Sequence, residues 1–316
     1  MNVVVTGGAG FIGSHFVDRL LAEEGDTRVT VLDALTYAGT RQNLAHLEEN
    51  GRFRFIHGDI VEAETVDPLV KDADLVVNFA AESFVDRSIG DARPFAATNV
   101  QGTLTILDAC RRHEVGMVQV STDEVYGSIP NGAFTEESPL QPNNPYSATK
   151  AGADLLCRSY HQTYRVDVRI FRGPNAYGPR QHPEKAIPTF TIAALEGRPL
   201  PVYGDGSNRR EWLHVTDFAR AVLTVIRRAQ PGEIYNGGGG HEVANLDLAR
   251  TICRLTEADD ELITFVEDRP GHDFRYSMVW DRLRGLGWEP AVPFERGIEE
   301  TVAWFRDHPE RRGGAG

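Results

Sequence analysis

Val3-Val-Val-Thr-Gly-Gly-Ala-Gly-Phe-Ile-Gly13 joins a short apolar run to a glycine-rich turn near the start of the chain. The apolar run predicts a buried strand, and the amphipathic Ser14–Glu23 predicts a helix directly after the turn. Glycines at a strand-to-helix turn let backbone N–H groups and the positive helix end approach a pyrophosphate, although such a turn also occurs without a ligand. We expect a dinucleotide to lie against Gly7, Gly10, Phe11, Ile12 and Gly13.

Further apolar runs follow at intervals that leave room for helices. A long helix is predicted from Tyr146 to about Tyr164, just before the last of these runs. Alternating strands and helices predict an α/β fold with a doubly wound parallel sheet of the Rossmann type. The predicted strands after the first are Val29–Leu32, Phe53–His57, Leu75–Phe79, Met117–Val120 and Val168–Phe171.

The pattern changes beyond Arg172, where prolines interrupt a loop-rich stretch. Helices are predicted near Thr189–Glu196 and over Trp212–Arg228, and the second of them could pack back on the first lobe. We therefore expect a smaller, discontinuous α/β lobe that binds the substrate. The predicted division is residues 1–172 plus about 208–232 for the sheet domain and about 173–207 plus 233–310 for the smaller lobe, with 311–316 as a disordered tail.

Composition excludes several classes of function. The chain has 316 residues and a formal net charge of −13, which disfavours nucleic acid as a partner. No apolar run is long enough to cross a membrane, and a strand that starts beside Met1 leaves no room for a signal peptide, so a cytoplasmic protein is expected. The three cysteines, Cys110, Cys157 and Cys253, are far apart, which argues against disulfides and against a zinc site.

Asp33 ends the second predicted strand, twenty residues after Gly13. A carboxylate there can accept hydrogen bonds from the adenosine ribose and repel a 2′-phosphate, so NAD is favoured over NADP. Residues at the ends of the next two strands fit an adenine contact and a small-residue floor under the cofactor, although they could be ordinary loop residues. These are Asp59, Ile60, Ala80 and Ala81.

The reactive groups are expected near the segment Ser121-Thr-Asp-Glu-Val-Tyr-Gly127, which follows the strand Met117–Val120. Neighbouring carboxylates repel each other, which raises one pKa and separates an acid from a base. Tyr146 and Lys150 are four residues apart on one helix face, where a lysine charge favours the phenolate and brings the tyrosine pKa nearer to neutral. Taken alone, each pattern more often marks solvent-exposed side chains with no catalytic role. Their occurrence together in one chain indicates catalysis.

The chain resembles the extended short-chain dehydrogenases that act on nucleotide sugars, through Gly7–Gly13, Asp33, Asn99 and the Tyr146/Lys150 pair. The resemblance runs from about residue 1 to 306. Within that family, four segments are similar to the dTDP-glucose 4,6-dehydratases, and the triplet Thr122-Asp-Glu124 discriminates best because 4-epimerases generally lack it. The segments are Ala81–Ser88, Ser121–Gly127, His182–Lys185 and Asp268–Asp273.

The resemblance implies a reaction in three steps. Tyr146, helped by Lys150 and Thr122, takes the C4 hydroxyl proton while the C4 hydride passes to NAD⁺. Glu124 then removes the C5 proton and Asp123 protonates the departing C6 hydroxyl, after which the hydride returns to C6. The enzyme is thus expected to be a lyase with a bound, regenerated NAD.

The resemblance also implies the remaining binding residues and a homodimer formed through paired helices. The cofactor site includes Asn99, Ser121, Tyr146 and Lys150. The nucleotide sugar is expected to contact Ser83, Asn175, Glu184, Lys185, Arg210, Asn236, His272 and Tyr276. Arg210 is the expected diphosphate anchor because a guanidinium can bind phosphate oxygens in pairs.

The chain departs from that family at three places. Phe84 stands where the family usually has histidine. Gly173-Pro174 and Ala176 stand where the family usually has a segment that contains a cysteine and a second asparagine. These departures affect the expected sugar or base more than the reaction. Two alternatives stay open, a nucleotide-sugar 4-epimerase and a non-catalytic NAD-binding protein that kept the fold.

Overall fold

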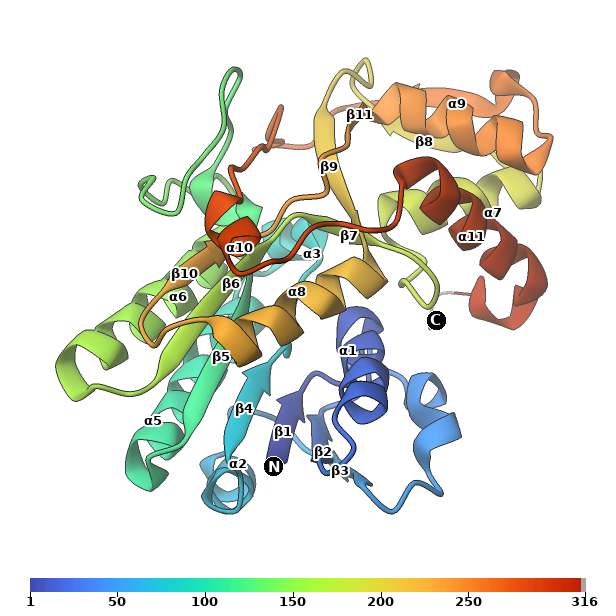
Figure 1. The fold of residues 1–316 in the computed structure, drawn as a ribbon. Helices are drawn as coiled ribbons and strands as arrows, with labels where there is room; N and C mark the ends of the chain where they lie inside the picture. The colour runs from blue at the N-terminus through green and yellow to red at the C-terminus, as the bar shows by residue number, and fades with distance from the viewer. Residues whose placement is uncertain (314–316) are drawn as a thin grey trace.

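The computed structural model describes residues 1–313, and its centre is a seven-stranded parallel sheet with the order β10-β6-β5-β4-β1-β2-β3 (Figure 1). Val5 of the first strand pairs with Val31 of one neighbouring strand and with Val77 of the other, so this strand has apolar neighbours on both of its edges. The strands are β1 (Asn2–Thr6), β2 (Arg28–Asp33), β3 (Phe53–His57), β4 (Leu75–Asn78), β5 (Gly116–Thr122), β6 (Val168–Gly173) and β10 (Ile234–Asn236). The predicted doubly wound parallel sheet is confirmed.

Successive residues of a strand point to opposite faces of the sheet, so apolar strands place apolar side chains on both faces. Helices cover both of these faces. Val3 and Val5 face one core, whereas Val4 faces the other. The first core is covered by α1 (Phe11–Glu23) and α8 (Val215–Arg228). The second core is covered by α2 (Ala63–Lys71), α5 (Thr103–His113) and α6 (Pro145–Tyr164).

A separate apolar core lies under the remaining sheets and helices, which Figure 1 shows beyond the carboxyl ends of the large sheet. One small sheet has the order β11-β9-β7, and β12 pairs with β8 in another. The strands are β7 (Asn175–Tyr177), β8 (Leu200–Tyr203), β9 (Arg209–His214), β11 (Glu242–Ala244) and β12 (Ile263–Val266). The helices are α7 (Ala186–Leu195), α9 (Asn245–Thr256) and α11 (Phe294–Asp307).

Short helical segments complete the fold. These are η1 (Arg41–Leu47), α3 (Val85–Gly90), α4 (Arg93–Phe95), η2 (Ala96–Gly102), η3 (Asp123–Tyr126), η4 (Asp260–Leu262), α10 (Asp281–Gly285) and η5 (Pro309–Arg311). No helix within residues 1–313 combines the length and the apolar composition needed to cross a bilayer.

Two predictions about the later elements were wrong. The helix predicted over Trp212–Arg228 begins only at Val215, because the first three residues pair as part of β9. The predicted disordered tail is ordered at its start, since the Arg311 guanidinium donates to Asn43 and Arg312 donates to the carbonyl of Phe305. The rest of the predicted tail, residues 314–316, lies outside the described residues.

Candidate active site

A cavity of about 500 Å³ opens between the carboxyl ends of the large sheet and the elements that follow it. Strand ends at this edge are where ligands bind in doubly wound sheets. The cavity brings together all the predicted catalytic residues and all but two of the predicted binding residues. Asn99 and Asn236 are the two that do not line it.

The glycine turn shapes one end of this cavity. Gly7 has a φ of +67°, and a Cβ there would come within 2.5 Å of the Ala80 nitrogen. A Cβ on Gly13 would come within 2.3 Å of the Gly7 oxygen. Because α1 starts after Gly10 with no side-chain cap, its first N–H groups are free to face a ligand. The turn therefore fits the pyrophosphate of a dinucleotide.

Asp33 closes the same end of the cavity. Its carboxylate accepts hydrogen bonds from Ala9 N at 2.8 Å and from Leu35 N at 2.9 Å. Burial raises the pKa of this carboxyl group, and the two backbone bonds oppose that effect. Each oxygen keeps a lone pair, so the group can still accept hydrogen bonds from a ribose.

Asn99 lies behind the residues that line the cavity. Its amide oxygen accepts from Glu82 N at 2.9 Å, and its nitrogen donates to the Glu82 carbonyl at 3.0 Å and to Thr149 Oγ1 at 3.0 Å. Asn99 thus fixes the loop after β4 to helix α6. This loop lines the cavity with Ala80, Ala81 and Ser83.

Helix α6 places Tyr146 and Lys150 in the cavity wall. Its start is fixed by a capping box in which Asn144 and Ser147 bond each other's backbone, and Pro145 occupies the first turn. The backbone nitrogen of Tyr146 also donates to Ser88 Oγ at 3.2 Å. Lys150 Nζ donates to the Val120 carbonyl at 2.8 Å, which ties the helix to β5.

The electrostatics of this pair differ from the prediction. Burial raises the pKa of the Tyr146 phenol well above its usual value, the Glu124 charge raises it further, and a hydrogen bond with Thr122 opposes the rise. Burial also lowers the pKa of Lys150. The expectation that Lys150 brings the tyrosine pKa nearer to neutral was wrong for this structure, because desolvation dominates and the ammonium is directed at a backbone carbonyl.

The two carboxylates of the Thr122-Asp-Glu124 triplet stand in different surroundings, as predicted. Thr122 caps η3 by accepting from Glu124 N at 3.3 Å, and its hydroxyl donates to Asp123 Oδ1 at 3.1 Å. Burial raises the pKa of Asp123 well above its usual value, and the Glu124 charge raises it further. Burial thus favours the protonated form of Asp123, and Glu124 Oε2 accepts a weak bond of 3.4 Å from the Tyr276 hydroxyl.

A buried polar network holds η3 in place. The Tyr126 hydroxyl donates to Asn236 Oδ1 at 2.8 Å and accepts from Arg172 at 2.6 Å. Arg172 in turn pairs with Asp154 of helix α6 at 2.8 Å. Asn236, which was predicted to contact the substrate, instead belongs to this network behind the cavity.

The far end of the cavity carries positive charge. The Arg210 guanidinium donates to the carbonyls of Arg209, Phe274 and Asp273. It also stands over the Tyr276 ring at 4.5 Å. His272 is paired with Asp268 at 2.6 Å. A buried guanidinium held only by carbonyls is suited to bind a diphosphate.

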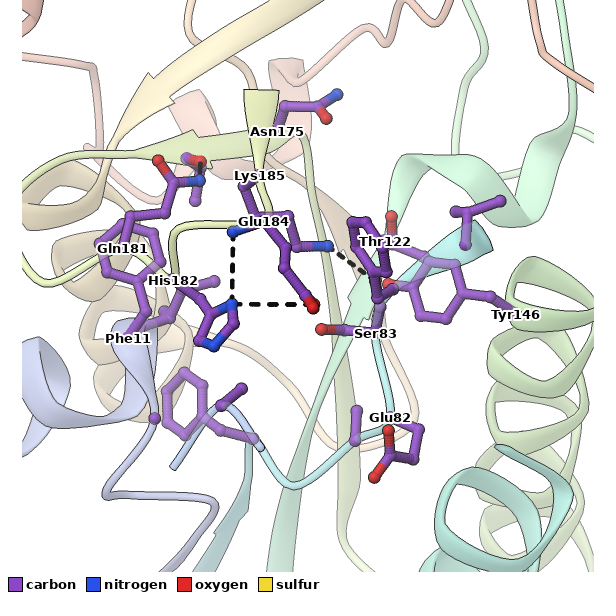
Figure 2. Close-up of a pocket in the computed structure, with 18 of the residues that line it drawn as sticks. Phe11, Glu82, Ser83, Thr122, Tyr146, Asn175, Gln181, His182, Glu184 and Lys185 are labelled. Atoms are coloured by element: carbon purple, nitrogen blue, oxygen red, sulfur yellow. Dashed lines mark hydrogen bonds and ion pairs between the residues drawn. The ribbon is translucent and has the colours of Figure 1, made fainter. Parts of the chain in front are cut away.

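Figure 2 shows how the loop from Gln181 to Lys185 enters the cavity between these two ends. Lys185 Nζ donates to the Ser83 carbonyl at 2.7 Å and lies 5.5 Å from the centre of the Phe84 ring. Glu184 pairs with Arg87, and His182 Nδ1 lies 3.8 Å from the Glu184 carboxylate. Burial lowers the pKa of Lys185 and that of His182.

The departure at Gly173 has a packing explanation, and nothing in the structure explains those at Pro174 and Ala176. A Cβ on Gly173 would come within 2.2 Å of the Phe218 ring, so this ring occupies the space of a side chain at position 173. The Ala176 carbonyl accepts from Gln181 Nε2 at 2.8 Å. Asn175 keeps its place in the wall, and its buried Nδ2 has no partner within residues 1–313. It therefore offers a free donor to a ligand.

Several residues of the cavity wall were not predicted. Arg269 lies inside the segment Asp268–Asp273 that carried the resemblance, so its position was an available signal. Glu82 likewise lies inside the segment Ala81–Ser88, whereas no local pattern marks Tyr37 in a loop or Asn245 at the start of α9. Within the described residues, no group of three or more His, Cys, Asp or Glu side chains is arranged to hold a metal ion.

Comparison with known proteins places the chain among dehydratases. A family model described as GDP-mannose 4,6 dehydratase matches residues 4–301. The Low-salt glycan biosynthesis protein Agl12 of Haloferax volcanii is 54% identical over 96% of this chain and 98% of its own. A dTDP-glucose 4,6-dehydratase of Streptomyces niveus is 50% identical over 98% of this chain and 94% of its own.

A solved structure agrees with these sequence matches. The crystal structure of DesIV, a dTDP-glucose 4,6-dehydratase from Streptomyces venezuelae with NAD and TYD bound, superposes with a TM-score of 0.96 at 50% identity. The match covers 98% of both chains. The glycine turn, the Tyr146/Lys150 pair and the Asp123-Glu124 pair therefore stand in a chain that belongs to the nucleotide-sugar 4,6-dehydratase family.

Proposed function

We propose that the protein is an NAD-dependent lyase that converts dTDP-glucose to its 4-keto-6-deoxy sugar and water. The observation that carries this proposal is the buried Asp123 carboxyl group beside Glu124 in the same cavity as Tyr146 and Lys150. A 4-epimerase needs the tyrosine and lysine but has no water to expel. The relatives named dTDP-glucose 4,6-dehydratase support the choice of substrate.

The residues of the glycine turn fit NAD, and we assign them to hold it. A Cβ at Gly7 would meet the Ala80 backbone and one at Gly13 the Gly7 carbonyl, so glycine at both positions keeps the tight turn that suits the pyrophosphate, and Asp33 suits the ribose hydroxyls. When bound, NAD⁺ would supply the hydride acceptor for the oxidation at C4 and the hydride donor for C6, and its cationic ring would oppose the burial that raises the Tyr146 pKa. The other assigned contacts are Phe11, Ile12, Asp59, Ile60, Ala80, Ala81 and Ser121, with Asn99 acting through the Glu82 loop.

Each proton transfer has its own side chain. Tyr146 Oη takes the C4 hydroxyl proton, while Lys150 and Thr122 orient and stabilise it. The resulting ketone acidifies the C5 proton, which Glu124 removes. Asp123 donates its proton to the C6 hydroxyl, which leaves as water. Asp123 is only 2% exposed, and this burial raises its pKa, which favours the protonated form that the step requires.

The positive end of the cavity is assigned to the nucleotide diphosphate. Arg210 and Arg269 provide guanidinium groups, and His272 and Tyr276 lie beside them. The sugar is assigned to the middle, where Ser83, Asn175, Glu184 and Lys185 line the wall. We keep the predicted division, residues 1–172 plus about 208–232 and residues 173–207 plus 233–310, with two exceptions. Strand β9 of the first part pairs in the small sheet, and strand β10 of the second part pairs in the large sheet.

We further propose a homodimer that works in the cytoplasm. The side chain of Leu155 on α6 is 56% exposed and that of Tyr164 is 44% exposed, which leaves apolar surface on the helix for a second copy. All three cysteines are free, as expected in a reducing compartment. Replacing Leu155 with glutamate should convert the dimer to a monomer in light scattering, and an unchanged mass would exclude this surface.

The function is tested by incubating the protein and NAD⁺ with dTDP-glucose, and in separate arms with UDP-glucose and GDP-mannose. A 4-keto-6-deoxy product, seen by its absorbance in alkali and by the loss of one water in mass spectrometry, is expected with dTDP-glucose. No product in any arm would overturn the proposal. An epimerase would instead return the sugar with inverted C4, and it would keep turning over with Asp123→Asn and Glu124→Gln together.

A further inference from the structure

After one turnover of the proposed reaction, two side chains no longer have the protonation state in which they started. This inference rests on that proposed function. Tyr146 gains the proton of the C4 hydroxyl, whereas Asp123 loses its proton to the departing water. Glu124 ends unchanged, because the proton that it takes from C5 returns there when the hydride reaches C6. Tyr146 therefore ends with one proton more, and Asp123 with one fewer, than at the start. A second turnover requires that this proton be moved.

Thr122 connects the two unbalanced groups. Its hydroxyl donates to Asp123 Oδ1 at 3.1 Å, and the same side chain lies beside the Tyr146 phenol, whose pKa it lowers. Figure 2 shows the Thr122 and Tyr146 side chains together at the cavity wall. A hydroxyl can accept one proton and donate another at the same time. The direction in which Thr122 donates is the direction that the proton has to travel.

The surroundings of the three groups favour this path over exchange with bulk water. Tyr146 is 8% exposed, Thr122 9% and Asp123 2%. Lys150 cannot easily serve as the carrier, since its ammonium donates to the Val120 carbonyl on β5. The short path is through the threonine hydroxyl.

We propose that Thr122 is a proton relay that resets the enzyme between turnovers. The O–H bond of Tyr146 breaks as an O–H bond forms at Thr122 Oγ1, and the original Thr122 O–H bond breaks as one forms at Asp123 Oδ1. Tyr146 returns to phenolate and Asp123 to carboxylic acid, with no net charge moved out of the cavity. The step needs no other reactant.

The test separates the first turnover from later ones. Thr122→Val removes the hydroxyl at nearly constant shape, and Thr122→Ser keeps it. In rapid-quench measurements with dTDP-glucose in excess, the valine variant should form one product per active site in a burst. It should then continue about 10- to 100-fold more slowly than the wild type, the range for loss of a positioned proton-transfer group. The wild type and the serine variant should show no burst.

Two controls address the other role of Thr122, which caps η3. Thr191→Val removes a buried hydroxyl in α7 that has no partner in the described chain, and it should leave the progress curve unchanged. If Thr122→Val does not fold, Thr122→Asn keeps a capping oxygen but has no hydroxyl, and it should show the same burst.

The outcomes are distinct. A first turnover slowed by the same factor as later turnovers, with no burst, would overturn the relay while leaving the proposed function intact. A wild-type protein that forms no dehydrated product would sink the proposed function, and the relay with it.

Discussion

Arg172 donates a hydrogen bond of 2.6 Å to the phenol oxygen of Tyr126, and through this contact helix α6 holds the turn that carries the two carboxylates. The link continues from Arg172 to Asp154, which lies on the same helix as Tyr146 and Lys150. A 3₁₀ turn of four residues has little stability of its own. The position of Asp123 and Glu124 thus depends on the Tyr126 hydroxyl.

Tyr126→Phe is predicted to reduce kcat by about 10- to 100-fold with little change in KM, since a misplacement of 1 Å can reduce a rate by about 100-fold. Steady-state kinetics and a crystal structure of the variant measure the effect, and the structure should show residues 123–124 displaced. Tyr160→Phe is the matched control, because it removes a tyrosine hydrogen bond that α6 makes to Asp108 of α5. Equal effects in both variants would contradict the prediction.

Asp123→Asn is predicted to lower activity and raise stability together. Removing the acid should slow product formation by about 10²- to 10⁴-fold. Burial raises the pKa of Asp123 in the folded state. The contribution of this carboxyl group to the free energy of unfolding is therefore complete below about pH 4, which is the pKa of aspartate in the unfolded chain. That contribution is lost as the pH rises through the folded-state pKa. The asparagine variant has no such loss.

Thermal unfolding measured from pH 4 to pH 8 checks the stability half of this prediction. The variant should unfold at a higher temperature than the wild type at pH 8, and the difference should shrink toward pH 4. Asp26→Asn, at an exposed position, serves as the control. A wild-type protein as stable as the Asp123 variant at pH 8 would show that the carboxyl group is not strained by burial.

His15→Gln is predicted to make the protein more resistant to acid. His15 Nε2 lies 2.9 Å from the Pro179 carbonyl, and burial lowers the pKa of this imidazole to about 4. Below pH 6.5 the unfolded chain gains a proton that the folded chain does not, so stability falls until about pH 4. That difference in pKa corresponds to a loss of about 3 kcal/mol at most.

Glutamine can donate to the same carbonyl without titrating, so the variant should lose less stability over this pH interval. Urea unfolding at pH 7 and at pH 4.5 measures the difference. His57→Gln is the matched control, since His57 also lies beside a backbone carbonyl, that of Ala34, but at the exposed surface. An equal loss of unfolding free energy between pH 7 and pH 4.5 in the wild type and in His15→Gln would refute the assignment of this loss to His15.

Gly173→Ala is predicted to destabilise the protein by about 1–3 kcal/mol, the usual effect of overpacking, because its Cβ meets the Phe218 ring. Phe218→Leu should recover part of this loss in the double variant, with a coupling energy of about 0.5–3 kcal/mol in a double-mutant cycle. Gly25→Ala, which has no atom within 4 Å of its Cβ, should change little. Additive effects of Gly173→Ala and Phe218→Leu would contradict the packing explanation.

The sequence was most informative where a feature is local. The strand before Gly7 and the alternation of apolar runs predict the large sheet, because a strand between two helical layers must be apolar on both faces. The triplet Thr122-Asp-Glu124 follows β5, so its position at the cavity follows from the topology of the sheet. Trp212 shows the limit of this approach, since an apolar residue just before a helix can equally end a strand.

Long-range contacts could not be predicted in this way. Asn99 and Asn236 carry amide groups suited to a ligand, but their partners are the Glu82 backbone and Tyr126, and only the folded chain brings these together. The Tyr146 pKa was mispredicted for a related reason, because spacing reveals the neighbouring lysine but not the loss of water around both groups.

The contact between Gly173 and Phe218 also constrains how this chain can diverge. With phenylalanine at 218, a β-carbon at 173 has no room, so a larger residue at 173 requires a smaller one at 218. The glycine at 173 is therefore accounted for by its neighbour, and it does not by itself mark a change in the sugar that the enzyme accepts.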